Sequence, residues 1–78
     1  MDWLEEKINI AENLNDIISI INKINSRKQK RAIIDVSNLN QEDLEKVKLL
    51  VENDFYVDTI KINNFTFLKL YRKIINHE

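Results

Sequence analysis

The sequence predicts an α+β fold in which the elements follow the order helix, strand, helix, strand, strand. Apolar residues recur at helical spacing over residues 2–25 and 41–53. A short apolar run fills residues 32–36, and two strand-like runs flank a pair of asparagines within residues 55–74. We therefore expect a single domain, residues 1–78, with a long N-terminal helix and a three-stranded mixed or antiparallel sheet that ends in a β-hairpin.

The first helix is predicted from steps of three and four between its apolar residues. These residues are Leu4, Ile8, Ala11, Leu14, Ile17, Ile18, Ile21 and Ile24. We expect one continuous helix over residues 2–25. A break within residues 13–16 into two shorter helices stays open, because asparagine competes for backbone hydrogen bonds. The segment SRKQKR, residues 26–31, ends the periodicity and is predicted to form a basic loop.

The second helix is predicted over residues 41–53, after a first strand at residues 32–36. Asn40 is the expected N-cap, with Asp43 at the third helical position. Leu39 precedes the cap and Leu44 follows it at the spacing of a hydrophobic staple. The start of this helix is therefore well marked in the sequence.

The hairpin at residues 55–74 is the most specific structural signal. Asn63 and Asn64 suit a two-residue type I′ turn, which needs positive φ at both positions. The turn fixes a register of Ile62 opposite Phe65, Ile60 opposite Phe67, Asp58 opposite Lys69 and Tyr56 opposite Tyr71. We favour a central place in the sheet for the second hairpin strand, with an edge place as the alternative, and residues 75–78 are expected to be a tail.

The residue types argue against an enzyme. The chain has no cysteine and no glycine, which excludes a thiol nucleophile, a thiolate metal site and a glycine-rich phosphate loop. Its one histidine, His77, stands next to last, where a general base is not held in place. Asp35 ends the first strand at an edge where open α/β sheets bind ligands, but capping of a turn or of the next helix is the favoured interpretation. We predict no catalytic residue, no metal site and no cofactor.

Neither secretion nor membrane insertion is predicted. The chain begins MDWLEE, without a basic segment followed by an apolar core, and its apolar runs stop well short of the ~20 residues of a transmembrane helix. The lack of cysteine suits a reducing compartment. We expect a cytoplasmic protein.

Charge is sorted along the chain although the net charge is −1. The two helical segments are acidic, whereas the loop and the hairpin are basic. The candidate residues for binding anions or nucleic acid are Arg27, Lys28, Lys30, Arg31, Lys61, Arg72 and Lys73. The hairpin aromatics are possible stacking partners for bases. The favoured interpretation is a solvated loop beside a buried aromatic face, because the aromatics pair with isoleucine and with each other in the predicted register.

The segment EDLEKVKLLVENDFYVDTIKINNFTFLKLYRKI resembles a class of small phage-encoded αβαββ proteins, over residues 12–74 in all. Those proteins enter the hairpin through a "GY.V" pattern, and residues 54–57, DFYV, stand in its place here with Asp54 and Phe55 departing from the usual glycine. The resemblance carries no catalytic motif. It implies an interaction role, in which such proteins bind a host protein or a small signalling molecule in the host cytoplasm.

We therefore predict a small non-enzymatic interaction protein, of the phage accessory or host-modulating kind, whose partner is a host protein or a second copy. The alternative is a nucleic-acid or nucleotide-binding protein that uses the basic loop and hairpin. A homodimer or higher homo-oligomer is expected, because the apolar stripe of a long first helix would extend beyond the sheet. The candidate oligomer interface is Leu4, Ile8, Ile10, Ile20, Ile21 and Ile24.

Overall fold

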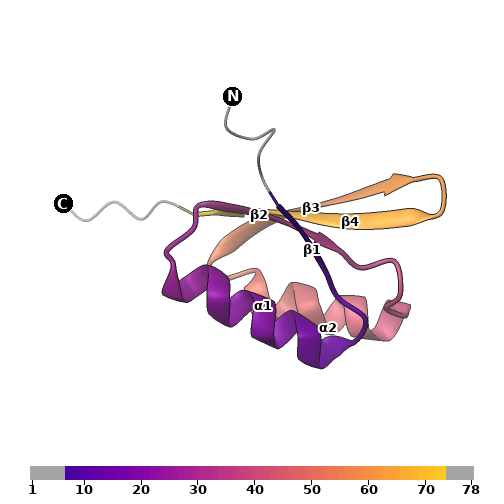
Figure 1. Ribbon diagram of the computed structural model, residues 1–78, viewed down its shortest axis with the longest axis horizontal. Coiled ribbons are helices and arrows are strands. Elements are labelled where there is room, and N and C mark those ends of the chain that lie inside the picture. Colours follow the sequence, from indigo (N-terminus) through magenta and orange to yellow (C-terminus); the bar gives the residue numbers. More distant parts are fainter. Residues whose placement is uncertain (1–6, 74–78) are drawn as a thin grey trace.

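The computed structural model describes residues 7–73, which form one four-stranded sheet and two helices. In chain order the elements are β1 (Ile8–Ile10), α1 (Leu14–Ser26), β2 (Arg31–Asp35), α2 (Gln41–Val51), β3 (Phe55–Ile62) and β4 (Phe65–Arg72). The sheet order is β1-β2-β4-β3. Both helices lie on the same face of the sheet (Figure 1). The predicted α+β class is confirmed, whereas the three-stranded sheet and the long first helix are wrong.

The long N-terminal helix is replaced by a strand and a shorter helix within the described residues. Asn13 is the N-cap of α1, with extended backbone and a side-chain oxygen that accepts from Asp16 N at 3.0 Å. The chain therefore breaks within residues 13–16, which was the alternative to one continuous helix. The helical periodicity upstream of Asn13 gave a wrong prediction, because Ile8 and Ile10 also fit the two-residue period of a strand. Pairing with β2 stabilises the strand. Residues 2–6 of the predicted helix lie outside the described residues.

β1 adds a parallel strand to the sheet, with Ile8 opposite Ile33 and Ile10 opposite Asp35. It leads through α1 into β2, as in a βαβ unit. Ala11 N then donates to Asp35 O at 3.1 Å and continues the pairing for one residue. β1 covers the outer edge of β2, so β2 is a central strand of the sheet.

The hairpin register is confirmed in all four predicted pairs, from Ile62 opposite Phe65 to Tyr56 opposite Tyr71. The central place of β4 is also confirmed, since β4 pairs antiparallel with both β2 and β3. The predicted type I′ turn is wrong in one respect. Asn63 has a φ of 54°, but Asn64 is not among the described residues with positive φ. The turn therefore needs only its first residue in the left-handed region.

α2 begins where the sequence predicts and ends two residues early, at Val51 rather than 53. The Asn40 side chain accepts from Asp43 N at 2.8 Å, which confirms the cap. Leu39 is buried and Leu44 packs against the same core, as a hydrophobic staple requires. The segment Asn53 and Asp54 then turns the chain directly into β3.

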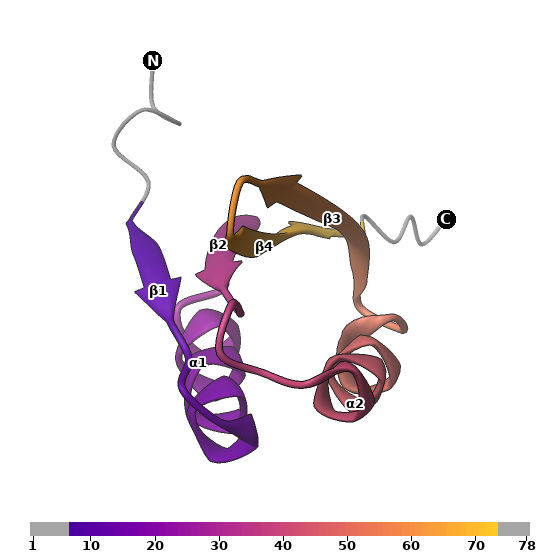
Figure 2. The same ribbon diagram turned by 90° about the vertical axis from the view of Figure 1, so that its right-hand side faces the viewer.

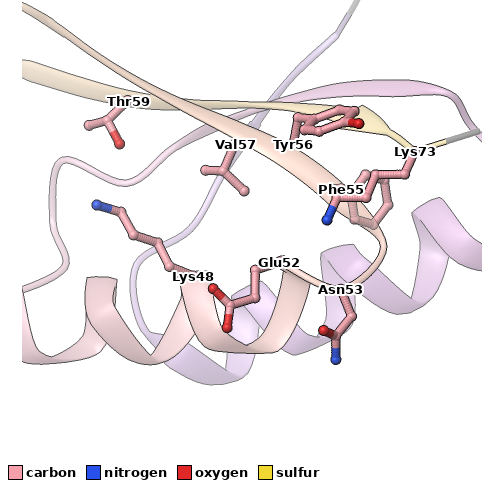
Figure 3. A pocket seen from close by; sticks show the side chains of 8 residues that line it. All are labelled: Lys48, Glu52, Asn53, Phe55, Tyr56, Val57, Thr59 and Lys73. Atoms are coloured by element: carbon pink, nitrogen blue, oxygen red, sulfur yellow. The ribbon is translucent and has the colours of Figure 1, made fainter.

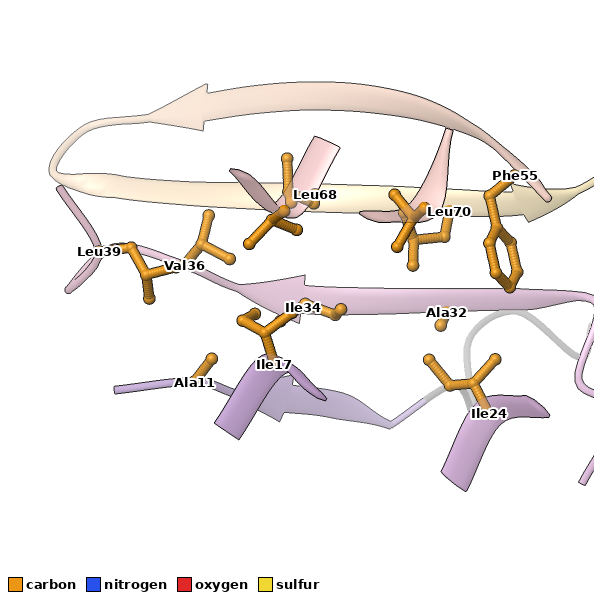
Figure 4. Close-up of a cluster of buried hydrophobic side chains, with 12 residues drawn as sticks. Ala11, Ile17, Ile24, Ala32, Ile34, Val36, Leu39, Phe55, Leu68 and Leu70 are labelled. Carbon is orange, nitrogen blue, oxygen red and sulfur yellow. The ribbon is translucent and has the colours of Figure 1, made fainter. Parts of the chain in front are cut away.

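One hydrophobic core lies between the sheet and the two helices (Figure 4). Its buried side chains are Ala11, Ile17, Ile24, Ala32, Ile34, Val36, Leu39, Val47, Val51, Phe55, Leu68 and Leu70. The strands contribute alternate residues, because successive side chains point to opposite faces of a sheet. Within residues 7–73, no helix lies on the opposite face of the sheet (Figure 2). In the part of the chain that is described, neither helix has the length and apolarity to cross a membrane.

Candidate interaction surfaces

The sheet face that no helix covers, here named the open face, is largely apolar. Strand alternation and register place on it Ile8 and Ile10 from β1, Arg31, Ile33 and Asp35 from β2, Phe65, Phe67, Lys69 and Tyr71 from β4, and Tyr56, Asp58, Ile60 and Ile62 from β3. Five of the apolar ones are at least half exposed: Ile8 50%, Ile10 61%, Tyr56 64%, Ile62 54% and Phe65 51%. This side of the molecule therefore presents hydrophobic side chains to solvent.

A hollow of about 150 Å³ lies in the open face and is lined by Ile8, Ile33, Ile60, Ile62, Phe67 and Lys69. Its wall is partly aromatic, because the rings of Phe65 and Phe67 stack with centroids 6.2 Å apart and planes 19° from parallel. A hollow of this size accommodates one large apolar side chain rather than a cofactor.

The prediction of a buried aromatic face is wrong, although the aromatic pairing on which it depended is correct. Tyr56 and Phe65 pair as expected, with Tyr71 and Ile62, yet both are more than half exposed. Both helices lie on the other face, which carries Leu68 and Leu70. A cross-strand pair shows that two residues share a face, and the helices decide which face is covered.

The charges of the open face are balanced. Arg31 and Lys69 contribute two positive charges, and Asp35 and Asp58 two negative ones. Asp58 stands opposite Lys69 across the β3–β4 ladder, and Lys69 Nζ lies 5.8 Å from the centroid of the Tyr71 ring. The four charged residues of the open face therefore cancel in sign, and the ammonium group of Lys73 lies beside them over the Tyr56 ring.

The predicted oligomer interface is divided among three environments. Ile8 and Ile10 lie on the open face. Ile20 and Ile21 on α1 are partly buried and pack against the core, and Ile24 is within the core at 1% exposure. Because α1 uses these residues to cover the sheet, Ile24 offers no surface to a partner. Leu4 lies outside the described residues.

Six of the seven residues predicted to bind anions or nucleic acid lie at one end of the molecule, here named the basic end. Arg27, Lys28 and Lys30 form the connection between α1 and β2, and Arg31 opens β2. The antiparallel pairing of β4 with β2 brings Arg72 and Lys73 alongside them, with Arg72 N donating to Lys30 O at 2.7 Å. Lys61 does not join this group, because it stands opposite Thr66 near the hairpin turn.

Arg72 has a structural role at the basic end. Its Nε donates to Gln29 O at 2.8 Å, and Nη2 donates to Asn25 Oδ1 at 3.1 Å and to Ile24 O at 3.4 Å. The guanidinium also lies over the Phe55 ring, 4.6 Å from its centroid. Arg72 thus connects the last turn of α1 and the following loop to β4, through donors on Nε and Nη2.

Asp35 also serves the fold, as the sequence indicated. Its Oδ1 accepts from Ser37 N at 3.0 Å and from Ser37 Oγ at 2.6 Å. Ser37 Oγ in turn accepts from Thr66 N at 2.9 Å, and Val36 N donates to Thr66 O at 2.8 Å. Asp35 therefore caps the turn after β2 and ties it to the start of β4.

A second concave region lies between α2 and β3, the strand at the far edge of the sheet (Figure 3). This groove has a volume of about 520 Å³. Lys48 of α2 points toward the strand, Val57 of β3 points toward the helix, and Glu52 of α2 also lines the groove. At the start of β3, Lys73 Nζ lies 5.2 Å from the centroid of the Tyr56 ring. The groove is polar, in contrast to the open face.

Residues 7–73 contain no group of three or more acidic, histidine or cysteine side chains that could hold a metal ion. His77 lies outside the described residues. No family model, no curated protein and no solved structure matches the chain. The resemblance to small phage proteins therefore stays a prediction, and the surfaces themselves carry the functional argument.

Sequence reasoning missed the open face and the groove. A signal for the first was present, since the residues Ile8-Asn9-Ile10 alternate in the manner of a half-buried strand. No local signal reveals the groove, because it depends on β3 lying at an edge with α2 beneath it, and strand order is decided by the whole sheet.

Proposed function

We propose that this chain is a non-enzymatic interaction protein that binds another protein through the open face. The observation that supports it is the set of five large apolar side chains, each at least half exposed, on one side of the sheet. Scattered exposed apolar residues are ordinary on protein surfaces, but a set gathered on one face of a sheet is typical of a protein interface.

The size of the open face fits such a role. An aromatic side chain has about 150–250 Å² to bury, so a half-exposed one presents on the order of 100 Å². Two of the five, Tyr56 and Phe65, are aromatic, and the three isoleucines are smaller. The five together are on the order of the ~300–600 Å² of the largest apolar patch on a typical monomer. The half-buried Ile33, Ile60 and Phe67 enlarge this patch toward the ~800 Å² that each partner contributes to a standard protein interface.

The partner expected from this chemistry presents apolar side chains, one of them suited to the hollow beside Phe67. The balanced charges of the open face predict an association that depends little on salt. The resemblance to phage proteins favours a host protein, in the cytoplasm of the host cell, as that partner. A second copy of the chain is the other candidate.

The experiment is affinity capture from cell lysate with the parent protein and two charge variants. Phe65→Lys places a cation in the open face, at a side chain that is 51% exposed. Leu49→Lys places one on α2, on the other side of the sheet, at a leucine that is 66% exposed. We expect one partner to be retained by the parent and by Leu49→Lys, and lost with Phe65→Lys. Equal retention by all three proteins would contradict binding through the open face.

A nucleic-acid-binding function is the second candidate, and the basic end favours it. Six cationic residues lie there, in the connection before β2 and at the paired ends of β2 and β4, so several phosphates could be neutralised together. The neighbouring aromatics Tyr56 and Tyr71 lie in the same part of the sheet, opposite each other.

The nucleic-acid candidate is tested by titrating a labelled single-stranded oligonucleotide at several salt concentrations. Binding that falls steeply with salt, and that is lost when Arg27, Lys28 and Lys30 are replaced by glutamine, would support it. Lys61→Gln is the matched control, because Lys61 lies away from the basic end. No binding at low salt would exclude this function.

A further inference from the structure

β3 is an edge strand of unusual length for its position. It pairs with β4 over eight residues and has no second neighbour among residues 7–73. The other edge strand, β1, has only three residues. Proteins protect long edges with proline, bulges, short strands or charge. β3 contains no proline and its pairing is continuous, so only Asp58 and Lys61 protect it.

The free edge of β3 exposes a row of backbone groups at regular spacing. A two-residue turn makes Ile62 and Phe65 a hydrogen-bonded pair, so alternate residues of β3 back to Tyr56 bond to β4. The residues between them, among which are Val57, Thr59 and Lys61, direct their N–H and C=O groups outward. An extended chain is the ligand that pairs with such a row, because its own groups repeat at the same distance.

The two sides of β3 are chemically different along this edge. Below the strand, Lys48 and Glu52 of α2 stand near Val57 and Thr59 (Figure 3). On the other side of the strand, Tyr56 and Ile60 belong to the open face. A chain added to β3 would therefore place alternate side chains against polar groups and against apolar ones.

A bare strand fits this edge better than a second copy of β3 does. α2 lies beneath β3 (Figure 2), so two copies paired edge to edge would bring their α2 helices together as well. Paired strands are about 4.8 Å apart, whereas packed helices need about 8–10 Å between their axes. The helices of two copies would thus be crowded, and a peptide without a helix beneath it avoids the conflict.

We infer that β3 binds an extended peptide segment of a partner protein as a fifth strand of the sheet. The peptide alternates apolar and polar side chains. Its apolar ones extend the open face beside Tyr56 and Ile60, and an acidic one faces Lys48 in the groove. The inference goes beyond the proposed function, because it assigns a ligand to the backbone edge of β3, which adjoins the open face but which separate substitutions can block.

The experiment begins with selection of displayed random peptides on the immobilised full chain. We expect enriched peptides with the apolar and polar alternation described above. Each is then synthesised with the backbone nitrogen methylated at one residue at a time. Only alternate N–H groups of the peptide face β3. A single methyl group at one of these residues should therefore weaken binding at least tenfold, and a methyl group at one of the residues between them should not.

Two variants at one position test the protein side. Thr59→Pro removes an outward N–H that does not bond to β4, a place where edge strands tolerate proline. It should weaken peptide binding at least tenfold while the far-UV circular dichroism spectrum and melting temperature stay close to those of the parent. Thr59→Val keeps the N–H and a β-branched side chain, so it should bind as the parent does.

Phe65→Lys separates this site from the proposed function, since it should abolish capture through the open face and leave peptide binding intact. Selection that yields no peptide sensitive to Thr59→Pro would overturn the inference. So would binding that is indifferent to backbone methylation. A concentration-dependent dimer that Thr59→Pro abolishes would assign the edge to a second copy and overturn it as well.

Discussion

Arg72 shows how much of this small fold depends on a single side chain. It reaches three acceptors at the end of α1 and in the loop that follows, and it lies on the buried ring of Phe55. None of the three acceptors carries a charge, so these are charge-assisted bonds to neutral groups. They also complement the negative end of the α1 dipole.

We expect Arg72→Met to lower the free energy of unfolding by about 1.5–3 kcal/mol, because hydrogen bonds to a charged group contribute on that order and methionine retains contact with Phe55. Urea denaturation measures the change. Lys73→Met is the matched control, since Lys73 lies over the exposed Tyr56 ring and should contribute less than about 1 kcal/mol. Equal effects of the two substitutions would show that the Arg72 bonds add no stability.

The hairpin turn places its conformational demand on Asn63 rather than on both asparagines. Its φ of 54° is in the left-handed region. Outside glycine, this region costs about 1–2 kcal/mol, and asparagine is among the residues that tolerate it best. Asn63→Gly should therefore leave the melting temperature unchanged or raise it, and Asn63→Val should lower it clearly. Asn64→Val should be milder, and a larger loss there than at Asn63 would contradict the assignment.

The first segment shows why part of this fold could not be predicted locally. Apolar residues from Ile8 to Ile24 satisfy a helical period, and Ile8 with Ile10 also satisfies a strand period. Local pattern does not choose between them. Pairing of β1 with β2 does, by giving backbone partners at the edge of the sheet, while the Asn13 side chain starts α1 afresh. Tertiary contact thus overrides the periodicity of the segment.

Asn13→Ala distinguishes the two readings of this segment by sign. In one continuous helix, alanine at this position would be stabilising, because it has the higher helix propensity. At an N-cap, the loss of the side-chain acceptor for Asp16 N should cost about 0.5–2 kcal/mol. We expect destabilisation in chemical denaturation, comparable to that of Asn40→Ala at the start of α2. Asn22→Ala within α1 is the control and should be neutral or stabilising.

The hairpin and the cap of α2 were predictable because each depends on neighbouring residues. The pairing of Asp58 with Lys69 follows from a turn two residues long, and the Asn40 cap from a pattern within one helical turn. The open face was not predictable in the same way. The sequence around Tyr56 fits a buried or an exposed position, because it does not indicate which face of the sheet the helices cover. The position of the helices depends on the entire chain.

The molecule as a whole is electrostatically polar along its helices. The acidic residues Glu42 and Asp43 lie in the first turn of α2, Asp16 in that of α1, and the basic end adjoins the last turn of α1. Helix dipoles favour this distribution without any ligand. The helix dipoles thus explain part of the charge distribution. They do not explain the exposed apolar residues of the open face. For this reason we favour the proposal of protein binding over that of nucleic-acid binding.

Self-association through the open face is the expectation for the protein without another partner. Because Arg31 and Lys69 balance Asp35 and Asp58 on this face, two copies can approach face to face without net repulsion. Burial of about 25 cal/mol for each Å² of apolar surface favours contact, against the entropy of association. Sedimentation equilibrium should therefore show a reversible dimer at high protein concentration, one that Phe65→Lys dissociates and Leu49→Lys does not. A mass of 9.3 kDa over the full concentration range would mean that the open face needs a different partner. A dimer that is lost only with Leu49→Lys would instead assign self-association to the side of the molecule formed by the helices.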